Sequence, residues 1–130
     1  MKLYLILAMA LALTACAPVH QLNTPFQLHL NEEAKVEDLH ITLISVLEDS
    51  RCPEGVFCIW EGTVKAIVNV QQGKENLGDI TLVSSRTLQY QEETSIAGYK
   101  IKLVDALPAK HEGITIKPEE YVLTFMVTKE

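Results

Sequence analysis

The sequence predicts an all-β protein: a small antiparallel β-sandwich or barrel of six to eight strands, with one loop clasped by a disulfide. Apolar and polar residues alternate with a period of two along most of the chain, as in strands that bury one face. Turn-forming residues separate the alternating stretches. No segment has the apolar spacing of a helix that packs on a core, and residues 32–38 have too few apolar side chains for one. Short strands joined by turns favour a sandwich or barrel.

In the first half of the domain, residues 26–30, 39–48 and 64–70 are expected to be strands. The first two carry large apolar side chains at every second position, with polar residues between them. The third has apolar residues on both faces, because Ile67 alternates with the valines, so both of its faces should be partly covered. The polar stretch 31–35 is expected to end the first of these strands.

In the second half, the expected strands are residues 77–82, 99–103 and 121–127. A turn at 71–74 precedes the first of them, since Gln-Gln-Gly-Lys is polar and contains glycine. The second alternates apolar residues with lysines, and Pro108 should end it because proline lacks a backbone donor. The third closes the domain.

The N-terminus predicts export. Met1-Lys2 is followed by an apolar run from Leu3 to Leu13 and by Leu13-Thr14-Ala15-Cys16. A cationic start, a short apolar segment and small residues before a cleavage point are typical of a secretory signal peptide. The run is too short to span a membrane, which takes roughly 20 residues. A cysteine directly after the small residues resembles the lipobox of bacterial lipoproteins; an ordinary signal peptide followed by a free Cys16 is the alternative.

This resemblance implies that the signal is cut before Cys16 and that Cys16 is then acylated. The expected organisation is a signal peptide at 1–15, a lipid-anchored tether at 16–25 and a single β domain at 26–130. Several acyl chains would anchor the protein firmly to the membrane, because each buried methylene contributes ~0.8 kcal/mol. The expected location is the cell envelope. Since Ala17 is not acidic, the resemblance implies the outer membrane, facing the periplasm, in a Gram-negative cell.

The net charge of the chain limits the classes of partner that it is expected to bind. The formal net charge is −6, and the acidic residues are spread along the sequence. Nucleic-acid binding needs clustered Lys and Arg, which the chain lacks, so no nucleic-acid partner is expected. Apart from its lipid, an acidic domain is also poorly suited to anionic membrane surfaces. A cationic protein partner stays open as an alternative.

With Cys16 assigned to lipid, Cys52 and Cys58 are an even pair in an oxidising compartment and are expected to form a disulfide. Pro53 and Gly55 supply turn chemistry inside the ring. The loop-entropy relation gives about 2 kcal/mol for so short a ring. A zinc site would need shorter spacings and further ligands, and a redox-active pair is usually Cys-x-x-Cys, so no metal is expected here.

Two linked segments form the strongest local signal of the domain: Asp49-Ser50-Arg51-Cys52-Pro53 and Cys58-Ile59-Trp60-Glu61-Gly62. This pattern resembles that of small, mostly uncharacterised bacterial lipoproteins and secreted domains, which place an Asp-Ser-Arg-Cys-Pro segment before a Cys-x-Trp-x-Gly segment. The resemblance is tight over these residues and loose elsewhere. It implies an exported, tethered β domain and brings no activity with it.

The residue types of these segments predict a structural clasp made by Asp49, Arg51 and Trp60. Asp49 can accept from backbone N–H groups where the strand ends. Arg51 has five donors, which suit loop carbonyls or a pairing with Asp49, Glu54 or Glu61. Trp60 lies two residues after a cysteine, so in an extended chain it shares that face and can pack over the disulfide.

A second interpretation of the same loop remains open beside the clasp. Val56 and Phe57 lie between the two cysteines, at the expected tip of the loop. Apolar side chains held on a rigid loop make good anchors for a protein partner. We therefore treat Val56 and Phe57 as a candidate partner-binding loop.

No constellation points to catalysis: the adjacent acidic pairs fall in expected turns, and no serine has a nucleophile motif around it. No catalytic residue and no cofactor are therefore expected. One weak metal candidate exists. If strands 26–30 and 39–43 formed a hairpin, His29 would face His40 across the polar side, close enough to share an ion. A third ligand, His111 or an acid, would still be needed, so no metal site is expected.

These observations favour a non-enzymatic binding or accessory module held at the cell envelope by lipid. The alternative is an inhibitor of a secreted hydrolase such as a lysozyme or a protease, because an acidic surface suits a basic enzyme. A weak metal-binding protein is a third hypothesis. A protruding apolar loop would favour the first two, and converging histidines or perturbed carboxylates would favour the third.

Overall fold

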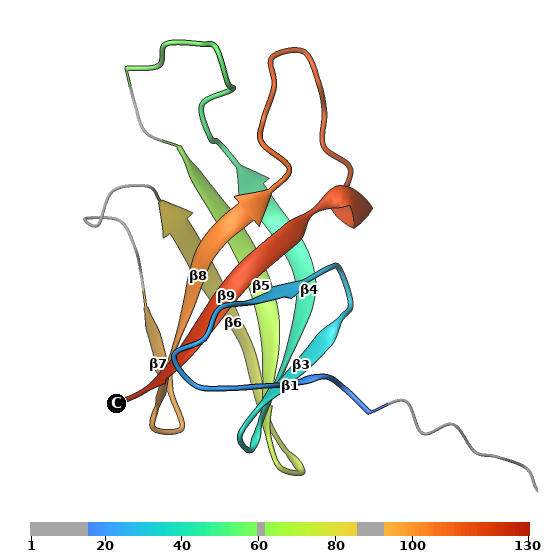
Figure 1. Ribbon diagram of the computed structural model, residues 1–130, viewed down its shortest axis with the longest axis vertical. Coiled ribbons are helices and arrows are strands. Elements are labelled where there is room, and N and C mark those ends of the chain that lie inside the picture. Colours follow the sequence, from blue (N-terminus) through green and yellow to red (C-terminus); the bar gives the residue numbers. More distant parts are fainter. Residues whose placement is uncertain (1–15, 60–61, 86–92) are drawn as a thin grey trace, which may run out of the picture.

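The computed structural model describes residues 16–59, 62–85 and 93–130, which form two β-sheets packed face to face (Figure 1). One sheet has the order β1-β3-β4-β5-β6 and the other β2-β9-β8-β7. All strand pairs are antiparallel except β1 with β3. The strands are β1 Val19–His20, β2 Phe26–Leu28, β3 Glu33–Val36, β4 Leu39–Asp49, β5 Thr63–Gln72, β6 Glu75–Ser85, β7 Thr94–Ile96, β8 Tyr99–Leu107 and β9 Val122–Lys129. The only helix of the described residues is a 3-10 turn at Pro118–Glu120.

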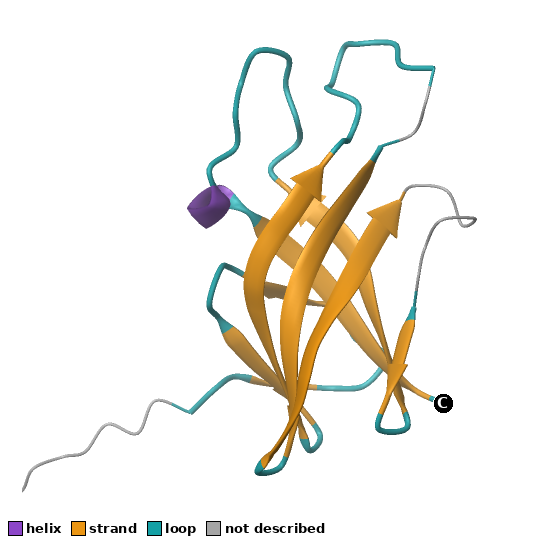
Figure 2. Ribbon diagram, turned by 180° about the vertical axis from the view of Figure 1, so that it is seen from behind, coloured by secondary structure: helices purple, strands orange, loops and turns teal. Residues whose placement is uncertain are grey.

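The alternation in the sequence produces the core. In β5 and β9 every second side chain is buried and its neighbours are half-buried, so each strand gives one face to the space between the sheets. Figure 2 shows the two layers from behind, with loops gathered at one end. The prediction of an all-β antiparallel fold is confirmed. The largest fully buried side chains include Phe125, Leu28, Leu39, Ile41, Leu43, Leu82, Ile101, Leu103 and Leu123.

The described residues contain nine strands, one more than the upper limit expected, because very short strands were not recognised. β3 is the informative case. It begins at Glu33, inside the stretch 31–35 that was expected to end the first strand. Its residues Ala34 and Val36 are fully buried. Two apolar side chains at alternate positions are enough for a strand that has β4 to pair with.

The hairpin between 26–30 and 39–43, on which the weak metal candidate depended, does not form. β2 pairs with β9, and the partner of β4 on that side is β3. His40 therefore lies opposite Lys35 and contacts Glu33, whereas the imidazole of His29 lies 2.9 Å from the carboxylate of Glu32. The two histidines do not face each other. Across the described part of the chain, no three His, Cys, Asp or Glu side chains gather as metal ligands.

The segment 16–25, expected to be a tether, is attached to the domain over most of its length. The Pro18 carbonyl accepts a hydrogen bond from the Lys35 N–H at 3.0 Å, and β1 then continues parallel to β3. The imidazole of His20 stacks on the buried Phe26, with 4.9 Å between ring centroids. Only Cys16 and Ala17 of the described chain precede this attachment. No helix in the described ranges is long and apolar enough to cross a membrane.

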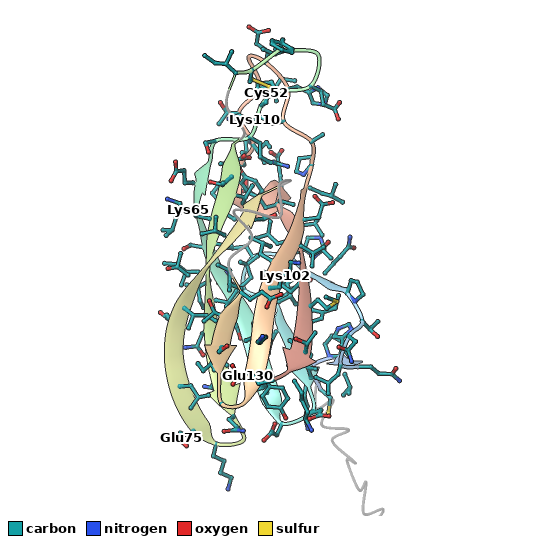
Figure 3. The ribbon with its side chains drawn as sticks, turned by 90° about the vertical axis from the view of Figure 1, so that its left-hand side faces the viewer. Cys52, Lys65, Glu75, Lys102, Lys110 and Glu130 are labelled. Atoms are coloured by element: carbon teal, nitrogen blue, oxygen red, sulfur yellow. A yellow bond between two sulfur atoms is a disulfide. The ribbon has the colours of Figure 1, made fainter. Side chains whose placement is uncertain are left out.

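The sandwich has two different ends, seen from the side in Figure 3. The loop end holds residues 50–59, 62 and 108–121 with the strand ends they join, and Cys52 and Lys110 mark it in the figure. The hairpin end holds the tight turns β3–β4, β5–β6 and β7–β8, near the labelled Glu75. At this end the hydroxyl of Tyr99 links the sheets.

Tyr99 lies in β8, and its phenol donates to the carboxylates of Glu37 at 2.7 Å and Asp38 at 2.8 Å in the β3–β4 turn. Hydrogen bonds to Glu37 and then to Asp38 raise the pKa of Tyr99 above its usual value, and the same bond from Tyr99 lowers the pKa of Asp38. A donor from one sheet therefore holds a turn of the other.

Candidate functional site: the loop end

Two long loops lie side by side at the loop end (Figure 1). The disulfide loop joins β4 to β5 and comprises residues 50–59 and 62 of the described chain, and the β8–β9 loop covers residues 108–121. The Glu54 N–H donates to the Lys110 carbonyl at 2.8 Å, and Glu54 and His111 form an isolated parallel bridge. Backbone pairing thus joins the two loops, although they are far apart in the sequence.

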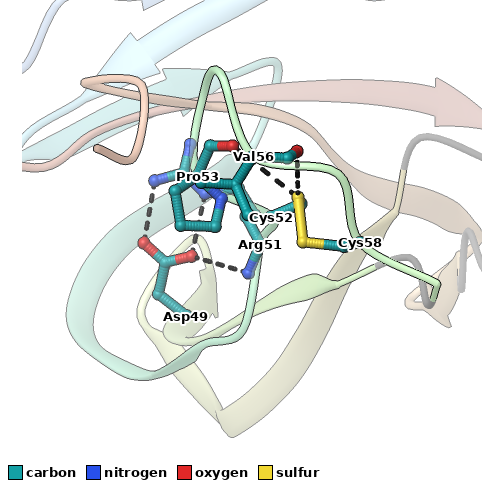
Figure 4. The surroundings of a disulfide bond; sticks show 6 residues. All are labelled: Asp49, Arg51, Cys52, Pro53, Val56 and Cys58. Atoms are coloured by element: carbon teal, nitrogen blue, oxygen red, sulfur yellow. Dashed lines mark hydrogen bonds and ion pairs between the residues drawn. A yellow bond between two sulfur atoms is a disulfide. The ribbon is translucent and has the colours of Figure 1, made fainter. Parts of the chain in front are cut away.

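The expected disulfide between Cys52 and Cys58 is confirmed. Inside the ring it closes, the Val56 N–H donates to the Pro53 carbonyl at 3.3 Å, which makes a turn. The carbonyl of Val56 also lies 3.1 Å from the sulfur of Cys52. The close-up in Figure 4 shows this ring beside Asp49 and Arg51.

The carboxylate of Asp49, at the end of β4, is the best-connected polar group of the loop end. Arg51 donates to it through Nε and Nη2, both at 2.8 Å, and through its backbone N–H at 3.2 Å (Figure 4). The hydroxyl of Tyr121 adds a fourth bond at 3.0 Å. Only 8% of the Asp49 side chain is exposed, so these bonds replace water around a nearly buried charge.

Arg51 connects this carboxylate to the second sheet. Its Nη1 donates to the Ala106 carbonyl at 2.7 Å and its Nη2 to the Pro108 carbonyl at 3.0 Å. Of the partners considered from the sequence, the structure shows Asp49 and loop carbonyls, whereas the carboxylate of Glu54 lies 3.9 Å from His111 instead. Asp49 and Arg51, two residues of the expected clasp, are thus joined by Tyr121. From here on, the clasp means Asp49, Arg51 and Tyr121.

The protonation states of the clasp follow from its contacts. Burial opposes the charge of Asp49, but the hydrogen bonds and positive charge of Arg51, with the bond from Tyr121, outweigh it and lower the pKa of Asp49. Burial, together with the hydrogen bond to Asp49, raises the pKa of Tyr121 to about 12. At neutral pH the clasp therefore holds a carboxylate, a guanidinium and a neutral phenol. Its polar atoms form hydrogen bonds within the protein, as expected of a group that stabilises the fold.

Ser50 and Gly62 close the mouth of the disulfide loop. The Ser50 N–H donates to the Thr63 carbonyl at 2.9 Å, and the Thr63 N–H donates to the Ser50 hydroxyl at 3.0 Å. Gly62 is buried against this point, and a Cβ there would overlap the carbonyl group of Ser50. This role of Gly62 was not predicted from the sequence, where its only signal is a glycine at the end of the motif.

The tip of the disulfide loop is apolar and exposed. Phe57 is 95% exposed, Ile59 89% and Val56 38%. On the neighbouring loop, Ile114 is 63% exposed. We call these four residues the apolar tip. The sequence predicted Val56 and Phe57 at the loop tip, whereas Ile59, which belongs to the motif, and Ile114 were not expected there. Trp60, the third expected clasp residue, lies outside the described residues.

Two hollows flank the clasp. One, of about 430 Å³, has Arg51, Glu54, Ser84 and Asp105 among its lining residues. The other, of about 330 Å³, is lined by Asp49, Lys110, Ile114, Thr115, Ile116 and Tyr121. The ammonium group of Lys110 there donates to the Asp49 carbonyl at 2.9 Å. The charged side chains of the second hollow are thus already engaged: Asp49 belongs to the clasp, and Lys110 is bonded to it. The two isoleucines give this hollow an apolar wall.

No family model, no curated protein and no solved structure matches this chain.

Gly62→Ala should lower the free energy of unfolding by about 4 kcal/mol or more, because the two legs of the loop must separate to admit a methyl group. Urea denaturation measures the change. Gly55→Ala is the matched control: a Cβ there meets no atom within 4 Å, and only its positive φ of 78° is strained. The control should lose about 1–2 kcal/mol. Equal losses in the two variants would contradict the close approach at Gly62.

Proposed function

We propose that the protein is a lipid-anchored, non-enzymatic binding module of the cell envelope, which presents its loop end to a protein partner. The exposure of Phe57 and Ile59, at 95% and 89%, carries this proposal. The disulfide and the clasp fix the loop that bears these side chains. Binding should therefore cost little conformational entropy of the loop. Large apolar side chains in water gain free energy only when something covers them.

The core of the sandwich does not include the side chains of the apolar tip. The half-buried apolar residues packed against the core include Val46, Ile96 and Ile116, but none of the apolar tip. The loop is fixed from below by polar and covalent contacts, namely the clasp, Ser50 and the disulfide. One set of residues thus fixes the loop, and a different set is exposed on it. This division supports a binding role for the exposed residues.

The anchor and the apolar tip lie toward opposite ends of the domain. The described chain enters from Cys16 beside β3, low in the sandwich, whereas the two loops rise from its other end (Figure 1). Since only Ala17 separates Cys16 from the attached Pro18, lipid on Cys16 would hold the domain close to the membrane. The apolar tip would then point away from that membrane, toward partners in the adjacent compartment.

The anchoring step is tested by intact mass. The mature protein should begin at Cys16 and carry the mass of acyl chains, since the lipobox-like segment ends there. Cys16→Ser should release the protein from the membrane fraction or leave it unprocessed. An unmodified N-terminus on the mature wild-type protein would contradict lipid anchoring.

The binding step is tested with Phe57→Ser combined with Ile59→Ser. Because neither side chain is buried, the unfolding free energy should stay within about 1 kcal/mol of wild type. Chemical crosslinks from the lipidated protein to an envelope protein in intact cells should disappear. Val19→Ser, which removes a side chain 72% exposed near the anchor, is the matched control and should keep the crosslinks.

Two results would overturn the binding role of the apolar tip. The double variant could unfold like Cys52→Ser, in which case these side chains serve the fold. Alternatively, the double variant could keep every crosslink made by wild type, in which case the partner binds elsewhere.

A further inference from the structure

We infer that the partner of the loop end is a basic protein that receives the apolar tip in an apolar pocket bordered by lysine and arginine. The inference rests on the proposed function and adds the chemistry of the partner. It derives from the charges of the loop end that the clasp does not use.

Exposed carboxylates lie on the two loops and at the strand end beside them, and we call them the acidic rim. Their residues are Glu54, Asp105, Glu112, Glu119 and Glu120. Within the described residues, Asp105, Glu112 and Glu119 form no ion pair. The loop end therefore carries the acidic rim as well as the apolar tip.

The basic side chains of the loop end neutralise this rim only in part. Arg51 is paired with Asp49, whereas the ammonium of Lys110, which donates to the backbone carbonyl of Asp49, keeps its positive charge. Lys117 is the exposed lysine of the described loops. His111 lies 3.9 Å from the carboxylate of Glu54. The rim thus keeps an excess of negative charge at neutral pH.

An apolar centre with an acidic rim distinguishes between possible occupants. A second copy of the chain would bring an identical acidic rim, so like charges would meet around the contact. An anionic membrane would be repelled in the same way. A basic protein instead gains from both parts, since its charges meet the rim while its pocket covers Phe57 and Ile59. A basic secreted hydrolase bound by an inhibitor belongs to this class of partner.

The two parts should act on different rate constants. Exposed charges act over about 8 Å at physiological ionic strength and mainly accelerate encounter. Buried apolar anchors mainly slow dissociation. Charge removal at the rim should therefore lower the association rate, and removal of the apolar tip should raise the dissociation rate.

The experiment uses the lipidated full-length protein in detergent micelles. The probe is the protein recovered in the envelope crosslinks, identified by mass spectrometry and purified separately. The association rate should fall about tenfold between low and high salt. Glu112→Gln with Glu119→Gln and Glu120→Gln should lower that rate several-fold at low salt and weaken its salt dependence, while the dissociation rate stays within about twofold of wild type.

A matched control removes the same charge far from the loops: Glu75→Gln with Asp79→Asn and Glu130→Gln should leave both rates near wild type. A salt-insensitive association rate, or equal effects of the two triple variants, would overturn the basic partner while leaving the binding module in place. A crosslink only to a second copy or to lipid would overturn it as well. If no crosslink depends on Phe57 and Ile59, the proposed function itself fails.

Discussion

The ion pair between Asp49 and Arg51 is the interaction on which the loop end depends. The partners are two residues apart, so the pair forms locally as β4 ends. The remaining donors of Arg51 then reach the carbonyl of Ala106 in β8 and that of Pro108 just after it, and Tyr121 approaches the carboxylate from just before β9. A local pair thereby becomes a joint between the sheets. Removing one partner of so buried a pair typically costs about 3–5 kcal/mol, because the other charge stays unpaired.

The two ends of the sandwich are joined in the same way. At each end a tyrosine of the β8–β9 sheet donates its phenol to a carboxylate of the other sheet: Tyr99 at the hairpin end and Tyr121 at the loop end. Between them the core is apolar and gives little direction to the packing. Hydrogen bonds to charged acceptors have stricter geometry, so they favour one relative position of the sheets. These bonds also fix the position of the disulfide loop. The loop therefore does not depend on its exposed apolar side chains to stay in place.

Alternation in the sequence predicted most of the strands and their buried faces, because the period of two depends on local geometry. It could not predict which strands pair. β2 and β4 both show the pattern, yet β2 lies beside β9, and the short β3 takes the place next to β4. The same limit applies at the loop end. The motif indicated Asp49 and Arg51 because their chemistry is local, whereas the roles of Gly62 and Tyr121 depend on contacts made only after the chain has folded.

In the folded protein, Arg51 and Tyr121 stabilise Asp49 as a carboxylate. A titration of the Asp49 carboxyl carbon by NMR tests it most directly. A pKa lowered by folding means that the carboxylate stabilises the fold above the unfolded-state value of about 3.9, and that this contribution is lost as the pH falls through the folded-state value. We expect a pKa of Asp49 below about 3.9 in the wild type and a higher one in Arg51→Lys, which loses the bidentate pairing. A wild-type pKa at or above about 3.9 would contradict this stabilisation.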